Sequence, residues 1–301
     1  MTAGRSGTLY LVATPIGNLE DISLRALRIL REAAVIAAED TRHTRKLLTR
    51  HHIGGRLVSL HEHNERARTP ALLRRLLSGD SVALVSDAGT PGISDPGTAL
   101  VEAAADAGVP VVPIPGPSAV LAALAASGLP AEAVTFLGFL PERGAERRRA
   151  LASIRGVPHT LVLFEAPHRL RETLEELLAA LGERRIAVAR ELTKVHEEVY
   201  RATLSETVRR FSAEAPRGEF TLVIEGARGQ VPTADASERD APADVPDDAA
   251  AAREAAREAL KRASAGGCSA QESVRRAARV SGLRRNEVYR LWLAIKREAG
   301  K

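Results

Sequence analysis

The sequence of 301 residues contains a single cysteine, Cys268. One thiol can build neither a disulfide framework nor a thiolate metal site, and nothing indicates an oxidising compartment. No pair of histidines has metal-ligand spacing on one helix face, so no metal is expected. Apolar runs are short too, and none approaches the eighteen or more residues that a membrane-spanning helix needs. The run at residues 9–14 is also too short for a secretory signal. We therefore expect a cytoplasmic protein without a membrane anchor.

Acidic and basic residues nearly balance over most of the chain, but not near its end. Residues 1–227 carry 28 Lys and Arg against 27 Asp and Glu, residues 228–252 carry 2 against 6, and residues 253–301 carry 13 against 5. A terminal segment with this excess of positive charge favours a polyanionic partner. From charge alone, a solvated helical tail is an equally good interpretation.

The order of the expected elements predicts an α/β fold. Short apolar runs that read as buried strands alternate with amphipathic helices, which is typical of a mostly parallel sheet. The first five strands are expected at residues 9–14, 35–38, 57–60, 81–86 and 109–114. A second set has strands at 159–165, 185–190 and 220–225 and helices at 169–181 and 204–213. We expect two α/β domains, at residues 1–138 and 139–227, with a hinge near residues 139–144.

The rest of the chain has a different composition. Residues 228–248 are rich in Pro, Ala and Asp with almost no periodicity, and they predict a flexible acidic linker. Residues 249–301 predict a basic helical module, with helices at 249–263, 270–280 and 285–297. The last two are joined by Ser281-Gly282-Leu283, a helix-turn-helix arrangement. Its inner seam would consist of Val274, Ala277, Ala278, Leu283, Val288, Leu291 and Trp292.

Loops rich in Gly and Pro follow three of the expected strands, at the sheet edge where α/β proteins bind ligands. They cover residues 14–19 (TPIGNL), 87–97 (DAGTPGISDPG) and 113–119 (PIPGPSA). Glycines let backbone amides approach a ligand closely, and Asp87 could accept hydrogen bonds from a cationic amine. A surface turn, or a helix cap at Ser118, is the structural alternative. The length of the second loop favours ligand binding. None of the loops is a GxGxxG or P-loop motif.

Charged residues gather at three further strand ends, at residues 39–42 (EDTR), 165–169 (EAPHR) and 190–198 (RELTKVHEE). Partly desolvated charges need partners. The spacing is equally compatible with an internal ion-pair network and with a substrate cleft that holds acid–base and phosphate-binding groups.

These motifs together resemble the tetrapyrrole methylase superfamily and, within it, the ribosomal small-subunit methyltransferase I family. The resemblance rests on eight ordered blocks over about residues 1–227. They are ATPIGNLEDIS (13–23), AEDTRHTRKLL (38–48), LVSDAGTPGISDPG (84–97), PIPGPSA (113–119), FLGFLP (136–141), FEAPHRL (164–170), RELTKVHEE (190–198) and GEFTLVIEG (218–226).

The resemblance implies a homodimer that uses S-adenosylmethionine to methylate the ribose 2′-oxygen of a cytidine in the decoding region of 16S rRNA, within the small ribosomal subunit. It implies a cofactor site between the two domains, with Leu163 and Phe164 of the second domain closing over it. Phe164 is a departure from the family pattern, in which a tyrosine could stand at this position. The cofactor residues of the first domain would be Pro15, Ile16, Gly17, Asp87, Gly89, Thr90, Ser118 and Ala119.

A ribose hydroxyl is a poor nucleophile until a base removes or polarises its proton. The candidate bases cluster at strand ends of the second domain that face the expected cleft, and no single one is preferred: Glu165, His168, Glu191 and Lys194. Phosphates next to the target would be held by Arg42, Arg169 and Arg190, because arginine suits bidentate phosphate contacts.

Two other functions stay open. A methylase acting on a corrin or porphyrin precursor would use the same cofactor site but would not need the basic C-terminal segment. A DNA-binding regulator could use the helix-turn-helix and sense a metabolite in the α/β body, but it would leave the charged strand ends without a purpose.

Overall fold

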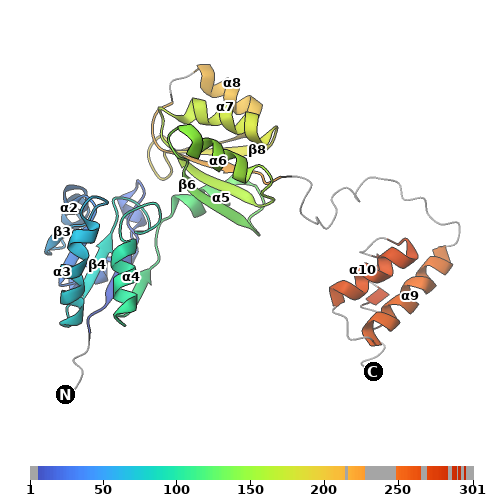
Figure 1. The fold of residues 1–301 in the computed structure, drawn as a ribbon, viewed down its shortest axis with the longest axis horizontal. Coiled ribbons are helices and arrows are strands. Elements are labelled where there is room, and N and C mark those ends of the chain that lie inside the picture. Colours follow the sequence, from blue (N-terminus) through green and yellow to red (C-terminus); the bar gives the residue numbers. More distant parts are fainter. Residues whose placement is uncertain are drawn as a thin grey trace. The chain divides into compact units, whose positions relative to one another are not determined.

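The computed structural model describes residues 6–213, 216–227, 249–265, 270–283, 287–289, 291–292 and 295. The chain divides into two compact units, one before and one after position 231. The first contains two five-stranded sheets and the second contains helices (Figure 1). The predicted linker at residues 228–248 lies outside the described residues.

The first sheet is entirely parallel, with strand order β3-β2-β4-β1-β5. All five strands predicted for this part of the sequence are confirmed. Leu9 lies in the strand between β4 and β5, opposite Val82 on one side and Val111 on the other. The strands are β1 (Leu9–Val12), β2 (Val35–Ala38), β3 (Leu57–Ser59), β4 (Val82–Val85) and β5 (Val111–Ile114).

Helices cover both faces of this sheet. Side chains of α1 (Leu24–Glu32) and α2 (Thr41–Arg50) pack on one face, and those of α3 (Glu65–Leu77) and α4 (Thr98–Asp106) pack on the other. Every residue of β2 and β4 is consequently buried, as expected for strands covered on both sides. This burial explains why continuous apolar runs, rather than alternating ones, marked these strands in the sequence.

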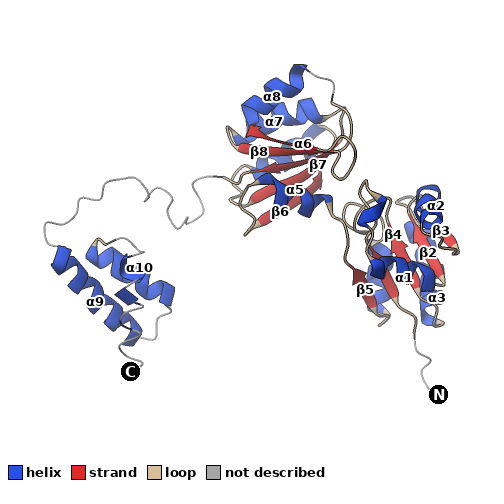
Figure 2. Ribbon diagram, turned by 180° about the vertical axis from the view of Figure 1, so that it is seen from behind, coloured by secondary structure: helices blue, strands red, loops and turns tan. Residues whose placement is uncertain are grey.

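The second sheet is mixed, with strand order β6-β7-β10-β8-β9. Only β6 and β7 pair in parallel, and the other three pairs are antiparallel. Figure 2 shows the strands of both sheets as red arrows. The strands are β6 (Val134–Phe139), β7 (Thr160–Glu165), β8 (Arg185–Arg190), β9 (Glu198–Thr203) and β10 (Phe220–Ile224).

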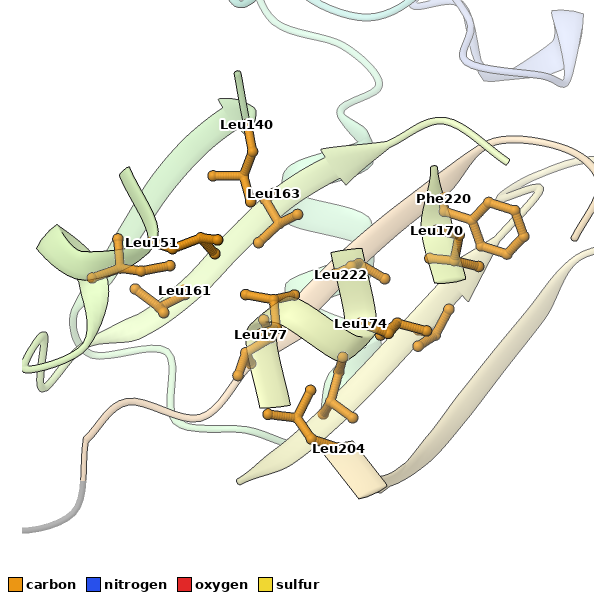
Figure 3. Close-up of a cluster of buried hydrophobic side chains, with 14 of the residues drawn as sticks. Leu140, Leu151, Leu161, Leu163, Leu170, Leu174, Leu177, Leu204, Phe220 and Leu222 are labelled. Atoms are coloured by element: carbon orange, nitrogen blue, oxygen red, sulfur yellow. The ribbon is translucent and has the colours of Figure 1, made fainter. Parts of the chain in front are cut away.

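The two faces of the second sheet have different cover. Residues from α6 (Gly144–Ile154), α7 (Leu170–Leu181) and α8 (Leu204–Ala213) form a leucine-rich core on one face (Figure 3). Side chains of α5 (Ala119–Ser127) pack on the opposite face, against Val162, Ala187 and Val223. Side chains alternate along each strand, so Leu163 points into the helix-covered core while Phe164 points to the other face.

Two strands were missed in the sequence, β6 and β9. Both are edge strands, and neither is a continuous apolar run. β6 contains Gly138 at φ +61° and an irregularity in its pairing between Phe136 and Phe139. It includes residue 139, where we expected the second domain to begin, so most of this strand falls before the expected boundary. β9 begins at Glu198, inside a block that was interpreted only as a charged cluster.

The second unit contains α9 (Ala249–Ala265) and α10 (Ala270–Ser281), and Gly282 follows α10 with φ +69°. Of the third helix predicted there, residues 287–289, 291–292 and 295 are described and helical. The seven residues predicted for the inner seam all belong to one apolar cluster, together with Ala256 and Leu260 of α9. Throughout the described part of the chain, no helix has both the length and the apolar character that crossing a membrane requires.

Candidate functional site

A cavity of about 560 Å³ lies at the carboxyl edge of the first sheet, against the face of the second sheet that α6–α8 leave uncovered. Its volume is in the range of pockets that bind small molecules and cofactors. The loops after β1, β4 and β5 contribute Ile16, residues 87–90 and residues 118–120. The second sheet contributes Phe136, Phe139, Phe164, Ala189 and Thr221.

Two short backbone bonds join the loops at the cavity rim. Thr14 N donates to Gly89 O at 2.8 Å, and Gly89 N donates to Thr14 O at 3.0 Å. Gly89 has φ +76°, a conformation that glycine adopts without strain. At the third loop, a Cβ on Gly116 would lie 2.9 Å from the Cβ of Ala13, so the backbone approaches the end of β1 closely only because residue 116 is glycine.

Three carboxylates from this edge line the cavity: Glu39, Asp87 and Asp95. Asp87 N donates to Glu39 Oε2 at 3.3 Å, and Asp87 Oδ1 accepts from Asp40 N at 3.0 Å. Burial, together with the charges of Glu39 and Asp87, raises the pKa of Asp95 to about 6. Burial likewise raises the pKa of Glu39. Carboxylates crowded in this way favour a cationic ligand.

The opposite wall is aromatic. The ring of Phe164 lies 5.2 Å from that of Phe136 and 5.5 Å from that of Phe139, centroid to centroid. Together with Leu192 and Ala189, these rings offer an apolar surface on which a planar ring can pack. The cavity therefore combines one acidic and one aromatic wall.

Glu165, at the end of β7, is held in a buried polar network. Its Oε2 accepts from Thr173 Oγ1 at 2.5 Å, and its Oε1 accepts from Ala166 N at 2.9 Å and lies 3.3 Å from Arg169 Nε. Buried Arg147 extends the network by donating to Thr173 Oγ1 at 2.7 Å. These bonds fix the turn at residues 165–169 that borders the cavity.

A second cluster joins Glu191, Lys194 and Glu219 beside the cavity. Lys194 Nζ lies 2.9 Å from Glu191 Oε1 and 3.1 Å from Glu219 Oε2, and Glu219 is itself a lining residue. Contacts with the two carboxylates raise the pKa of Lys194 in spite of its partial burial. The hydrogen bond from Lys194 and that from Glu219 N lower the pKa of Glu191, although burial opposes them. Lys194 and Glu191 are therefore both charged at neutral pH.

The loop that carries this cluster is strained. Glu191 has φ +50° and Thr193 has φ +67°, which is rare for residues with a Cβ and most of all for a β-branched one. Strain of this kind persists only where surrounding contacts enforce it, and it often marks functional sites. Gly17 abuts the loop, since a Cβ there would lie 2.5 Å from Lys194 Cγ.

The structure separates the predicted site residues into two groups. Eight of them line the cavity: Ile16, Asp87, Gly89, Thr90, Ser118, Ala119, Phe164 and Glu165. Pro15 is buried beneath the first loop, Gly17 contacts Lys194, and Leu163 faces the leucine-rich core, so none of these three is a lining residue. Ser118 also caps α5, with its Oγ accepting from Leu121 N at 3.4 Å.

The remaining predicted residues lie outside the cavity lining, and two of them, Glu191 and Lys194, form the cluster beside it. His168 is exposed. Arg42 is exposed and pairs with Asp40 at 2.8 Å. Arg169 Nη2 donates to Leu140 O at 2.7 Å, and Arg190 Nε donates to Arg217 O at 2.7 Å. Among these four, Arg42 therefore keeps the most exposed charge.

Sequence reasoning missed several cavity residues. Glu39 and Asp95 stood in quoted motifs but were not singled out, although each is a carboxylate near a strand end. Phe136 and Phe139 lie on β6, which the sequence did not reveal as a strand. Repeated phenylalanines in the block FLGFLP were the one available signal.

The chain matches the family model described as Tetrapyrrole (Corrin/Porphyrin) Methylases over residues 8–208. A solved uroporphyrin-III C-methyltransferase from Thermus thermophilus, complexed with S-adenosylhomocysteine, is 26% identical, with a TM-score of 0.52 over 72% of this chain and 97% of that one. A diphthine synthase structure shares the fold at 19% identity, with a TM-score of 0.57 over 73% of this chain and 90% of that one. The fold and the cavity define an S-adenosylmethionine-dependent methyltransferase.

Curated relatives show to which group of this family the chain belongs. Proteins named Ribosomal RNA small subunit methyltransferase I are 49% identical over 73% of this chain and 76% of the relative in Halalkalibacterium halodurans, and 44% identical over 97% of this chain and 94% of the relative in Mesorhizobium japonicum. The chain belongs to the tetrapyrrole methylase family and, within it, to the ribosomal RNA small subunit methyltransferase I group.

The cavity fits S-adenosylmethionine in volume and in chemistry. The donor carries a sulfonium and an ammonium group, which suit the carboxylates of Glu39, Asp87 and Asp95. Its adenine suits the apolar wall formed by Phe136, Phe139 and Phe164.

Proposed function

We propose that this protein methylates the ribose 2′-oxygen of a cytidine in the decoding region of 16S rRNA, cytidine 1402 in the family's RNA numbering. The observation that carries the proposal is the sequence identity of 43–51% to relatives whose name refers to ribosomal RNA, against 25–26% to the uroporphyrin-III C-methyltransferase structures. The Mesorhizobium japonicum relative matches 97% of the chain, including the C-terminal helices. The uroporphyrin-III C-methyltransferase structures match 72–73%. Relatives with the same name in other organisms match 73–79% of the chain at 43–51% identity, so the name that refers to ribosomal RNA already goes with the α/β part of the chain.

The donor supplies a methyl group on a positively charged sulfur, and the protein must hold the acceptor oxygen in line with it. The carboxylates of the acidic wall offset the positive charge before transfer. The aromatic wall excludes water from the other side. The chain's own contribution to the chemistry is therefore positioning, desolvation and activation of the ribose hydroxyl.

We propose that the cluster of Glu191, Lys194 and Glu219 activates that hydroxyl. Lys194 is protonated and so cannot accept a proton, but it holds both carboxylates in place. Glu219 lines the cavity and is largely exposed, so its carboxylate can accept a proton from the substrate. Glu165 has its oxygens bound to Thr173, Ala166 and Arg169, and this favours a role in shaping the cavity wall.

Phosphates next to the target nucleotide remain the proposed ligands of Arg42, Arg169 and Arg190. Since Arg169 and Arg190 already bind backbone carbonyls, Arg42 is the strongest of the three candidates. The basic C-terminal module, which we place at residues 249–301, would add further phosphate contacts. We also propose that the protein acts as a homodimer on the small ribosomal subunit in the cytoplasm, as the family resemblance implies.

The test is a methyl-transfer assay with labelled donor and three acceptors: 16S rRNA, assembled small subunits and a tetrapyrrole precursor. We expect label in RNA or subunits and, by mass mapping, on the ribose of one cytidine. Label in the tetrapyrrole alone would support the competing small-molecule function. Transfer to neither class of acceptor would refute both.

The proposed positioning roles of Lys194 and Glu165 have their own test. We expect Lys194→Ala to bind the donor in calorimetry but to transfer methyl groups at least tenfold more slowly. Glu165→Gln should also transfer more slowly, because the turn at residues 165–169 loses its charged anchor. If both variants bind the donor and keep the full rate, neither residue contributes to catalysis.

A further inference from the structure

Helix α2 carries an unusual concentration of positive charge. Its ten residues, TRHTRKLLTR, include four Arg and Lys and no acidic residue. Elsewhere before residue 228 the two signs nearly balance. The helix follows β2, whose next residue, Glu39, lines the cavity.

The charges occupy one face of the helix. Thr44, Leu47 and Leu48 are buried against the first sheet, whereas Arg45, Lys46 and Arg50 are exposed. Their spacing, together with that of Arg42, follows the three- and four-residue repeat that places side chains side by side on a helix. From Arg42 to Arg50 the face is about 12 Å long. These residues border a shallow hollow along the helix.

Among the described residues, three of the four cations have no acidic partner in an ion pair. Within the described ranges, no acidic side chain forms an ion pair with Arg45, Lys46 or Arg50, whereas Arg42 pairs with Asp40. Like charges four residues apart on a helix, such as Lys46 and Arg50, destabilise it by a few tenths of a kcal/mol. An anion bound outside the helix would relieve this repulsion.

This face is connected to the proposed catalytic cluster. Arg50 also borders a second hollow, together with Gly17, Thr193 and Lys194. Lys194 in turn contacts Glu219, which lines the cavity. A chain of phosphates that leaves the cavity beside Lys194 can therefore continue past Arg50 and along α2.

We propose that the exposed face of α2, through Arg45, Lys46 and Arg50, binds the phosphate backbone of the RNA strand next to the methylated nucleotide. This inference rests on the proposed function and adds the place where the substrate lies. A membrane surface fits less well, because the apolar side of α2 is buried in the core and its exposed face has no apolar residue to insert.

The test compares two triple variants of the full chain. One is Arg45→Gln/Lys46→Gln/Arg50→Gln. The matched control, Arg148→Gln/Arg149→Gln/Arg155→Gln, removes three exposed charges at α6, which covers the face of the second sheet opposite the cavity. Glutamine keeps a high helix propensity, so both variants should fold and bind the donor as the unaltered chain does.

The readout is the affinity for a 16S rRNA transcript as a function of salt. Losing three phosphate contacts should lower the slope of log K against log salt by about 2, and it should weaken binding by about 50-fold at 0.15 M salt if counterion release dominates. The control should keep the affinity within about twofold to threefold and should leave the slope nearly unchanged. Arg45→Lys/Arg50→Lys, which keeps the charges, should retain most of the affinity.

Two failures are distinguishable. If the unaltered chain methylates rRNA and the α2 variant binds it with the same affinity and salt slope, the inference about α2 is wrong and the proposed function stands. The same result would point to an acidic protein as the ligand of this face. If the unaltered chain neither binds nor methylates rRNA or small subunits, the proposed function itself fails.

Discussion

The acidic wall of the cavity leads to a prediction about Asp95. Its pKa is raised to about 6, mainly by burial and by the charge of Glu39. The native state therefore holds this proton more tightly than the unfolded chain, in which the pKa is near 3.8. Stability from this group is full below pH 3.8 and is lost as the pH rises through 6. Above that range the ionised carboxylate weakens the fold.

The size of the effect follows from the shift. A difference in the pKa of Asp95 from 3.8 in the unfolded chain to about 6 in the native state corresponds to a loss of stability of about 3 kcal/mol at pH 7.5 and of about half of that at pH 5. Asp95 is only partly buried, so water screens its charge and the measured effect should be smaller. We expect Asp95→Asn to increase the free energy of unfolding by about 1–2 kcal/mol at pH 7.5, and by about half as much at pH 5.

Urea denaturation of both proteins at the two pH values measures this difference. A matched control is Asp106→Asn, which changes an exposed aspartate at the end of α4 and should shift stability by less than about 0.5 kcal/mol. If Asp95→Asn does not increase the free energy of unfolding more at pH 7.5 than at pH 5, the ionised carboxylate is not destabilised by burial and by its neighbours.

The same variant should show why a destabilising charge is kept. S-Adenosylmethionine carries one positive charge more than the product left after methyl transfer. Removing a negative charge from the cavity should weaken donor binding by about tenfold, which is about 1.4 kcal/mol, and should affect the product less. Calorimetry with the two ligands gives the ratio. An unchanged ratio would mean that the acidic wall does not discriminate between them.

Two further predictions concern packing around the cavity. Thr173→Val keeps the shape of the side chain but removes the hydroxyl that links Glu165 to Arg147, and we expect the free energy of unfolding to fall by about 3 kcal/mol. The control is Thr207→Val, whose hydroxyl donates only to Thr203 O, and there we expect a fall of about 1 kcal/mol. Urea denaturation of both variants is the measurement, and equal losses would contradict the role of the network. Gly116→Ala places a Cβ 2.9 Å from the Cβ of Ala13 and should lower Tm by about 3–8 °C in a thermal melt. The control is Gly156→Ala, whose Cβ would have no atom within 4 Å, and it should leave Tm nearly unchanged.

The cavity shows which structural features local sequence patterns can predict and which they cannot. The buried strands β2 and β4 and the loops after β1, β4 and β5 were predictable because apolar runs and glycine-rich turns are local signals. Parallel strands bring such loops to one edge, which is how Asp87, Gly89 and Ser118 could be assigned to one site. The edge strand β6 was missed, and Phe136 and Phe139 were missed with it.

Chemical roles were harder to predict than positions. Glu165 and Lys194 are both charged residues at strand ends and look alike in the sequence. In the structure, Glu165 is fully enclosed by Thr173, Ala166 and Arg169, whereas Lys194 joins two carboxylates beside the cavity. Each set of partners depends on strand pairing and helix packing, which residue spacing does not specify.

The sequence alone determined the α/β architecture, the order of the first five strands along the chain, the three glycine-rich loops that reach the cavity and the uneven charge of the C-terminal segment. These features depend on composition and on neighbours within one turn or one strand. Tertiary structure decided which face of the second sheet borders the cavity, the crowding of Glu39, Asp87 and Asp95, and the connection from Lys194 to the basic face of α2. These depend on distances between residues far apart in the chain, and only the folded backbone sets those distances.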